Sequence, residues 1–241
     1  MRIKKIIHKV LQSAGYEIVY YRPAHHPLAR TKWLLDLYDV SVVLDVGANT
    51  GQFSERLREA GYQQQIISFE PLPDAFAVIK EKAINDRWGW EVNNFALGSR
   101  EERTMIHIAG NSYSSSILPM LSTHEQSRPE SRYVGEVEIK VKTLDSVFLS
   151  RWRSGQRVFL KIDTQGFEKQ VLDGAAESLP FIDTIQIEMS MTPLYEGGLL
   201  FEEMYSFVKS LGYRLVAIEP GFFDTETGEM FQVDGIFHRF A

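Results

Sequence analysis

Cysteine is absent from this chain of 241 residues, and positive charge is scarce. Without cysteine the protein has no disulfide, no thiolate metal ligand and no cysteine nucleophile, and nothing in the sequence requires an oxidising compartment. Lysine and arginine number 26 against 32 aspartate and glutamate residues, which gives a formal net charge of −6. Because a duplex-binding surface needs clustered basic side chains, we do not expect nucleic acid as a partner.

Long apolar runs are missing as well. None approaches the roughly 20 residues that cross a bilayer, and the N-terminus lacks the uninterrupted apolar core of a signal peptide. We therefore predict a cytoplasmic location. The length allows one α/β domain that buries about 70% of its unfolded surface, and we expect a helical extension over residues 1–40 before a single domain over residues 41–241. A homo-oligomer is compatible with these features.

The first predicted helix, Met1–Gln12, is amphipathic and basic. Its aliphatic side chains fall on one side of a helical wheel, with Arg2, Lys4, Lys5 and Lys9 around them. We favour packing of this apolar stripe on the same domain or on a partner chain. A weak peripheral membrane contact is the alternative.

A strand, a glycine turn and a helix start follow one another in the run VVLDVGANTG over residues 42–51. Gly47 and Gly51 permit backbone angles and close approaches that a Cβ forbids, and the helix from Gln52 aims free N–H groups above the turn. A dinucleotide fingerprint would read G-x-G-x-x-G and hold a pyrophosphate. Asp45 would repel that group but complements a ligand with an ammonium and a sulfonium. The loop therefore predicts S-adenosylmethionine, the alternative being an ordinary strand-to-helix connection.

A second acid supports the same cofactor. Glu70 ends the predicted strand 65–70, about two dozen residues beyond Asp45, where a ribose-binding carboxylate is expected. Its alternative role is to cap the helix near Pro73. After the third strand, residues 94–97 are expected to contact adenine, although Phe95 fits a core position equally well. The predicted cofactor-binding residues are Asp45, Gly47, Ala48, Asn49, Gly51, Phe53, Glu70, Pro71, Asn94, Phe95, Ala96 and Asp163.

Strands and helices alternate from residue 42 onward, which predicts a parallel sheet. The predicted strands are 42–46, 65–70, 91–96, 158–162, 184–189, 213–218 and 235–240, and the predicted helices are 28–38, 52–60, 74–85, 167–176 and 201–211. The segments 104–108 and 136–141 alternate with period two around a serine-rich loop. They predict an inserted antiparallel pair whose loop forms a lid. The hairpin-like end of the chain makes the last strand antiparallel.

Several segments resemble the FkbM family of S-adenosylmethionine-dependent methyltransferases. The strongest pair is VLDVGANTGQF (43–53) and LKIDTQGFEKQVLDGA (160–175), and the others are SFEPL (68–72), FALGS (95–99), NSYSSSIL (111–118), IEMSMTPLYEGG (187–198) and QVDGIFHR (232–239). The resemblance implies a Rossmann-like class I methyltransferase fold over residues 41–241, with a doubly wound, mostly parallel seven-stranded sheet. It also implies O-methylation of a hydroxyl, often on a sugar or a natural product. Many members carry glutamate at the position of Gln165.

A base or a metal must help an aliphatic hydroxyl to attack the methyl group. Asp163 is the leading candidate base, and Glu188, His238 and His107 are its rivals. Asp163 can instead cap the following helix or bind the methionine amino group, and His238 can be structural. Asp163, Glu188 and Asp234 could supply oxygens to Mg²⁺ or Ca²⁺. Because no D-x-D-x-D spacing occurs, we expect no obligatory metal.

The small-molecule or glycan acceptor is expected beside the serine-rich loop. The predicted acceptor-binding residues are Asn111, Ser114, Ser115, Ser116, Gln165 and Tyr195. A solvated, flexible loop is the alternative. Two other functions stay open. One is a non-catalytic module that binds S-adenosylmethionine, for which Gln165 is a hint, and the other is a dinucleotide-dependent oxidoreductase, against which the loop spacing argues.

Overall fold

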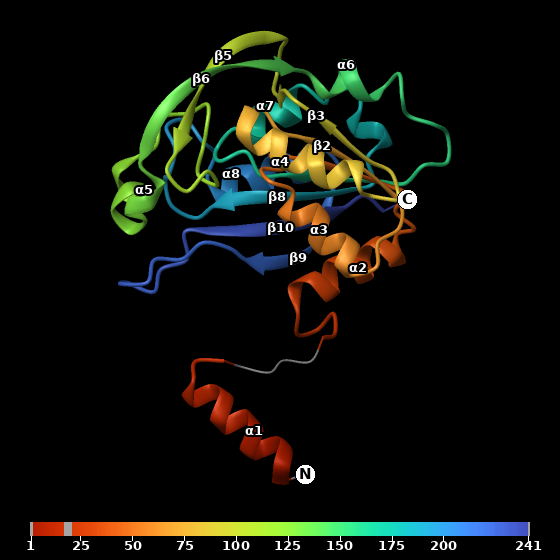
Figure 1. Cartoon of the computed structure of the whole chain (residues 1–241). Helices are drawn as coiled ribbons and strands as arrows, with labels where there is room; N and C mark the ends of the chain where they lie inside the picture. The colour runs from red at the N-terminus through yellow and green to blue at the C-terminus, as the bar shows by residue number, and fades with distance from the viewer. Residues whose placement is uncertain (1, 17–20, 241) are drawn as a thin grey trace.

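The computed structural model describes residues 2–16 and 21–240, in which helices cover both faces of a seven-stranded sheet (Figure 1). The strand order is β3-β2-β1-β7-β8-β10-β9, and β10 alone runs antiparallel to its neighbours. This topology confirms the predicted doubly wound fold with a reversed last strand. The strands are β1 (Val42–Val46), β2 (Gln65–Phe69), β3 (Trp90–Asn93), β7 (Val158–Ile162), β8 (Thr184–Ser190), β9 (Arg214–Pro220) and β10 (Gln232–His238).

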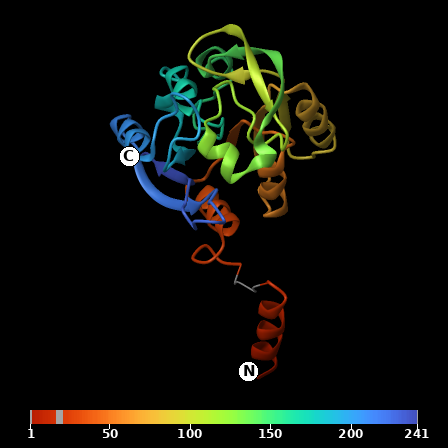
Figure 2. The ribbon, with the colours of Figure 1, turned by 90° about the vertical axis from the view of Figure 1, so that its left-hand side faces the viewer.

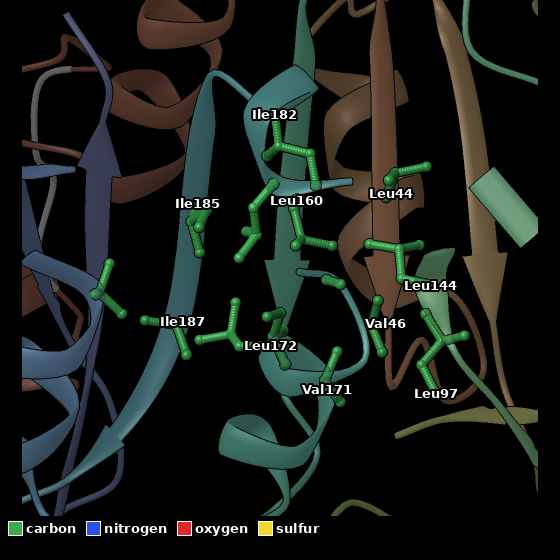
Figure 3. Packing of buried hydrophobic residues seen from close by; sticks show 14 of the residues in the cluster. Leu44, Val46, Leu97, Leu144, Leu160, Val171, Leu172, Ile182, Ile185 and Ile187 are labelled. Carbon is green, nitrogen blue, oxygen red and sulfur yellow. The ribbon is translucent and has the colours of Figure 1, made fainter. Parts of the chain in front are cut away.

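Two helical layers enclose the sheet because its central strands are apolar on both faces. Every residue of β1 is buried. Val43 packs with α2 (Pro27–Leu37), α3 (Gln52–Glu59) and α4 (Pro73–Ile84). Leu44 and Val46 pack on the other face, whose helices are α6 (Leu144–Phe148), α7 (Glu168–Asp173) and α8 (Phe201–Ser210) (Figure 3). Each fully buried aliphatic side chain contributes ~1.5–3 kcal/mol to this core.

The insert forms a second sheet of three strands in the order β4-β6-β5. Its long strands, β5 (Glu102–Ala109) and β6 (Tyr133–Lys142), are antiparallel, as predicted. The loop between them carries α5 (Ser122–Ser127) and a 3₁₀ turn at Pro129–Ser131. The predicted single strand 91–96 is wrong, because the chain leaves the main sheet after β3 and joins the insert as β4 (Ala96–Leu97). The amide of Asn94 holds this break by donating to two backbone carbonyls at 3.0 and 3.1 Å.

The predicted extension over residues 1–40 contains α1 (Arg2–Ser13) and α2, and α2 contributes Leu34 and Leu35 to the core of the domain. Met1, where the predicted helix begins, lies outside the described residues. Figures 1 and 2 show α1 apart from the layered domain, and Ile7 and Val10 of its apolar stripe are 47% and 61% exposed. Of the helices in residues 2–16 and 21–240, none combines the length and the apolar character that a bilayer crossing needs.

Candidate active site

The glycine loop after β1 lies against the end of β7. Gly47 has a φ of +75°, and a Cβ at this residue would stand 1.9 Å from the carbonyl oxygen of Asp163. Glycine is therefore required for the two strand ends to meet. The N–H groups of Gly47 and Ala48 both donate to the Phe69 carbonyl at 3.1 Å. These two donors tie the loop to β2.

Glu70 connects the same loop to the tip of β2. Its carboxylate is buried and accepts the backbone N–H of Asn49 at 2.7 Å and that of Leu72 at 2.8 Å. Burial raises the pKa of Glu70 to about 7, and the two backbone bonds oppose the shift. Each oxygen accepts one protein N–H and retains a lone pair for a further donor. Glu70 can thus hold the loop and still receive a ligand hydroxyl.

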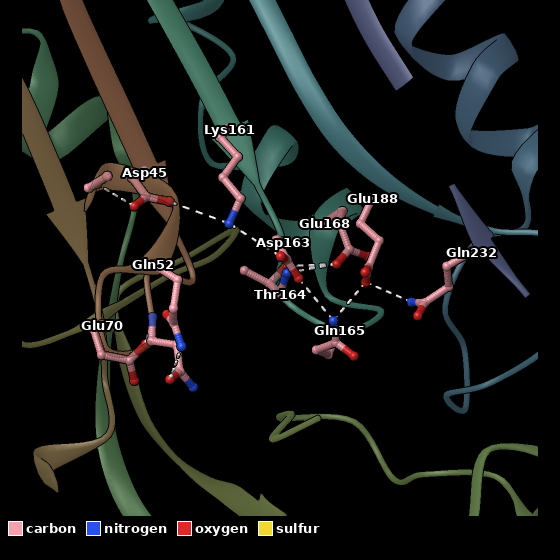
Figure 4. Close-up of polar contacts among 12 residues, drawn as sticks. Asp45, Gln52, Glu70, Lys161, Asp163, Thr164, Gln165, Glu168, Glu188 and Gln232 are labelled. Atoms are coloured by element: carbon pink, nitrogen blue, oxygen red, sulfur yellow. Dashed lines mark hydrogen bonds and ion pairs between the residues drawn. The ribbon is translucent and has the colours of Figure 1, made fainter. Parts of the chain in front are cut away.

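Asp45 lies inside the sheet. It is fully buried, one oxygen accepts the Ser54 hydroxyl at 2.8 Å, and the other lies 3.4 Å from Lys161 Nζ (Figure 4). Lys161 Nζ also lies 3.2 Å from Asp163. Burial lowers the pKa of Lys161, but Asp163, Asp45 and Asp234 outweigh it and raise this pKa above its ordinary value. The expectation that Asp45 faces the ligand is therefore wrong, since it faces a lysine that the sequence interpretation overlooked.

One carboxamide joins the acids at the ends of β7 and β8. Gln165 Nε2 donates to Asp163 at 2.9 Å and to Glu188 at 2.7 Å (Figure 4). The same oxygen of Glu188 accepts Gln232 Nε2 from β10 at 2.7 Å. Tyr195 donates its hydroxyl to Gln165 Oε1 at 2.7 Å. These five side chains place two carboxylates side by side on neutral hydrogen-bond donors.

Burial raises the pKa values of the acids around this network. The pKa of Glu188 stands well above its ordinary value because of burial and the neighbouring carboxylates of Asp163, Glu168 and Asp234. The pKa of Glu168 is raised to about 7 and that of Asp234 to about 6, again chiefly by burial. A site with several acids near neutrality can exchange protons at physiological pH. Within the described part of the chain, no three His, Asp or Glu side chains are arranged to hold a metal ion.

The serine-rich loop uses its hydroxyls for its own folding. Ser116 donates to the Gln165 carbonyl at 2.7 Å, and Ser115 accepts a backbone N–H of β5 at 3.0 Å. Ser114 accepts the amide of Asn111 at 3.2 Å. The loop is therefore a docked wall of the site, and its hydroxyls take part in its own folding as well as lining the cavity.

A cavity of about 660 Å³ lies between the sheet edge, α2, the glycine loop and the insert. Its size falls within the range of about 300–1,000 Å³ usual for ligand sites. The predicted site residues that line it are Gly47, Ala48, Asn49, Phe53, Glu70, Pro71, Ala96, Ser114, Ser115, Ser116, Asp163, Gln165 and Glu188. Asp45, Gly51, Asn94, Phe95, Asn111, Tyr195 and His238 lie outside this lining.

His238 lies at the opposite end of the sheet. It pairs in register with Thr184, the first residue of β8, while the cavity is formed at the last residues of that strand. Its ring stacks on Tyr38 at 3.6 Å, and Nδ1 lies 2.8 Å from the Thr184 hydroxyl. We therefore withdraw His238 as a candidate base. His107 lies outside the cavity lining as well, and its Nδ1 lies 2.8 Å from a carboxylate oxygen of Glu136 inside the insert.

Comparison with known proteins identifies the family of this chain. The family model described as the methyltransferase FkbM domain matches residues 45–215. The chain belongs to the FkbM methyltransferase family. Methyltransferase 1 of Beauveria bassiana is 29% identical over 164 residues, which are 63% of this chain and 65% of that protein. The 2-O-methyltransferase NoeI of Sinorhizobium fredii is 26% identical over 190 residues, 74% of each chain.

A crystal structure of the methyltransferase FkbM from Methylobacillus flagellatus shares the fold. The TM-score is 0.51 at 13% sequence identity, over 82% of this FkbM-family chain and 44% of the other. This chain thus spans less than half of that protein and about two thirds of the Beauveria relative.

Several polar residues of this FkbM-family site, including the five named next, escaped the sequence interpretation of cofactor and acceptor contacts. Lys161, Gln186, Gln232, Asp234 and Arg128 all line the cavity. The signal was present in β8 and β10, where polar residues recur at alternate positions, and in β7, where Lys161 is the single polar residue of an apolar strand. Such residues share one face of the sheet. Arg128 gave no comparable signal, since it follows a short helix in the insert.

Proposed function

We propose that the chain is an S-adenosylmethionine-dependent O-methyltransferase that acts on a hydroxyl of a sugar, a glycan precursor or a small natural product. The observation that carries the proposal is the acid-rich cavity at the tips of β1, β2 and β7. Its charged lining residues are the acids Glu70, Asp163, Glu188, Glu219 and Asp234 and the bases Arg56, Arg128 and Lys161. This excess of acid favours a donor with a sulfonium and an ammonium over a pyrophosphate. The 2-O-methyltransferase relative supports a hydroxyl acceptor.

The donor lies across the first two strand ends in this proposal. Glu70 accepts the ribose hydroxyls with the lone pairs that Asn49 and Leu72 leave unused. The adenine lies against Ala96, which lines the cavity. The methionine end reaches Asp163 at the end of β7. The acceptor binds on the side formed by β8 and β10 before the methyl group is transferred to it.

The reaction moves a methyl group in line from sulfur to oxygen. The bond between the sulfonium and the methyl carbon breaks while the acceptor oxygen forms its bond to that carbon, and the hydroxyl proton leaves to a carboxylate. The enzyme gains most by aligning donor and acceptor away from water. Glu188 is suited to take the proton because its pKa is raised. Asp163, fixed by Lys161, holds the donor and shares this role.

Calorimetry with S-adenosylmethionine and NAD side by side, followed by transfer of a tritiated methyl group, tests the proposal. The acceptor panel contains methyl glycosides of neutral monosaccharides and simple phenols. We expect the methyl donor to bind and NAD not to bind. Preferential NAD binding would make the chain an oxidoreductase, and donor binding without transfer to any acceptor would make it a binding module.

Variants of Asp163 assign its role. Asp163→Asn is expected to reduce turnover more than donor affinity, and Asp173→Asn, in the exposed pair with Lys169, serves as the matched control. Equal losses of turnover and affinity would make Asp163 a binding residue. The cytoplasmic location and a homo-oligomeric state stay predictions, which fractionation and light scattering can check.

A further inference from the structure

The backbone of Gln165 has an unusual conformation, and hydrogen bonds hold the residue on several sides. Its φ of +55° lies in the left-handed region, and Gly166 follows with a φ of +95°. For a residue other than glycine such a conformation costs about 1–3 kcal/mol and persists only where the surroundings enforce it. The surroundings here include the hydroxyl of Ser116, which donates to the Gln165 carbonyl at 2.7 Å. The side chain is therefore presented at a fixed point between β7 and β8.

Chemistry sets the orientation of the carboxamide. The nitrogen lies 2.9 Å from Asp163 Oδ1 and 2.7 Å from Glu188 Oε2, so the two carboxylate oxygens are no further apart than the sum of these distances. The reverse orientation would turn the amide oxygen toward two acceptor oxygens. Tyr195, which is 3% exposed, adds a hydroxyl donor to Oε1 at 2.7 Å. The N–H groups of Gln165 consequently face both acids.

We propose that Gln165 is a positioning residue of the methyl-transfer site, whose carboxamide, oriented by Tyr195, holds Asp163 and Glu188 as one pair ready to take the acceptor proton. The inference rests on the proposed function and assigns Gln165 a role other than the acceptor contact expected from sequence. An N–H donated to a carboxylate stabilises its charged form, and two such bonds offset the repulsion between neighbouring acids.

The charges around Glu188 explain why this carboxylate needs a neutral hydrogen-bond donor. Asp163 and Lys161 face it from β7, Glu168 from the start of α7 and Asp234 from β10. Only Lys161 is a base, and it lies within 3.4 Å of both Asp45 and Asp163. The charged form of Glu188 therefore depends on its two amide hydrogen-bond donors, Gln165 and Gln232. Removing Gln165 leaves Gln232 as the one described side chain that donates to this carboxylate.

Infrared titration of the protonated carboxyl band tests the inference without an acceptor. The purified chain is saturated with S-adenosylhomocysteine, and the band of Glu188 is assigned by its loss in Glu188→Gln. Gln165→Ala is expected to raise the midpoint of this band by about one pH unit or more, because the charged form loses a donor. Tyr195→Phe should give a smaller rise. Gln63→Ala, an exposed glutamine far from the cavity, should give none.

Transfer of tritium from labelled S-adenosylmethionine to a pool of neutral methyl glycosides supplies the second readout. In Gln165→Ala we expect kcat to fall by about tenfold or more and its pH profile to shift, with donor affinity within about twofold of the parent chain. Gln165→Asn keeps an amide and carries the test if the alanine variant fails to fold.

Two outcomes would overturn the inference: an unchanged carboxyl midpoint in a folded Gln165 variant, or a loss confined to the acceptor KM. If the parent chain binds no S-adenosylmethionine, the proposed function fails separately, whatever the carboxyl band does.

Discussion

Replacing Lys161 with methionine is expected to lower the free energy of unfolding by about 3–5 kcal/mol, the usual effect of removing one partner from a buried ion pair. The lysine side chain is 9% exposed and that of Asp45 is 0% exposed, with 3.4 Å between Nζ and the carboxylate. Methionine preserves most of the volume but leaves Asp45 with the Ser54 hydroxyl as its hydrogen-bond donor. The variant therefore buries an uncompensated charge in the middle of β1.

Urea unfolding followed by circular dichroism at neutral pH measures this loss. Adding Asp45→Asn to Lys161→Met removes the buried charge, and we expect it to recover at least about half of the loss, as a coupled pair requires. Lys32→Met is the control, because the pair of Lys32 with Asp36 is exposed and contributes only about 0–1 kcal/mol. The assigned charge pairing would be refuted if the free energy of unfolding of Lys161→Met were within about 1 kcal/mol of that of the parent chain. It would also be refuted if the double variant recovered none of the lost free energy.

Three further predictions follow from the site and the extension. Glu70→Gln should weaken S-adenosylmethionine binding about tenfold in calorimetry, while exposed Glu59→Gln leaves the affinity unchanged; equal affinities would remove Glu70 from the donor site. Burial raises the pKa of Glu168 from 4.5 to about 7, so the folded protein holds this proton longer and stability should fall as the pH rises through that interval. Glu168→Gln should flatten the fall in Tm, and an unchanged slope would contradict the assignment. Finally, Ile7 and Val10 of α1 are exposed and do not pack on the domain, so membrane contact, the alternative to packing, predicts weak sedimentation with anionic vesicles that Ile7→Asp abolishes; sedimentation that survives the substitution would exclude the apolar stripe as the contact.

The main sheet was predictable because its signals are local. The runs 42–46 and 158–162 are short and apolar, and both form strands with the predicted bounds. The switch out of the sheet after β3 was not predictable from periodicity. It depends on Asn94, whose amide bonds to backbone 23 and 24 residues earlier in the chain. Propensity carries no information about such a partner.

The site was harder to predict because it is assembled across strands. Asp45 and Lys161 are 116 positions apart in the sequence yet face each other in the register of β1 and β7. From one strand alone, an acid beside a glycine turn looks like a ligand contact. The hydroxyls of Ser114 and Ser116 raise the same difficulty, because a polar loop can serve either a ligand or its own folding. Only the three-dimensional partners distinguish these cases.

The cavity favours a cationic methyl donor even though Asp45 lies buried in the sheet, because other acids line it. Glu70, Asp163, Glu188 and Asp234 line the cavity, and burial raises the pKa values of Glu188 and Asp234. Such acids are costly to ionise in an empty site, and a bound sulfonium and ammonium would offset that cost. Methyl transfer removes the sulfonium charge, so part of the free-energy cost of keeping these acids ionised is no longer offset. The same acids that favour binding of the donor should therefore favour release of its product.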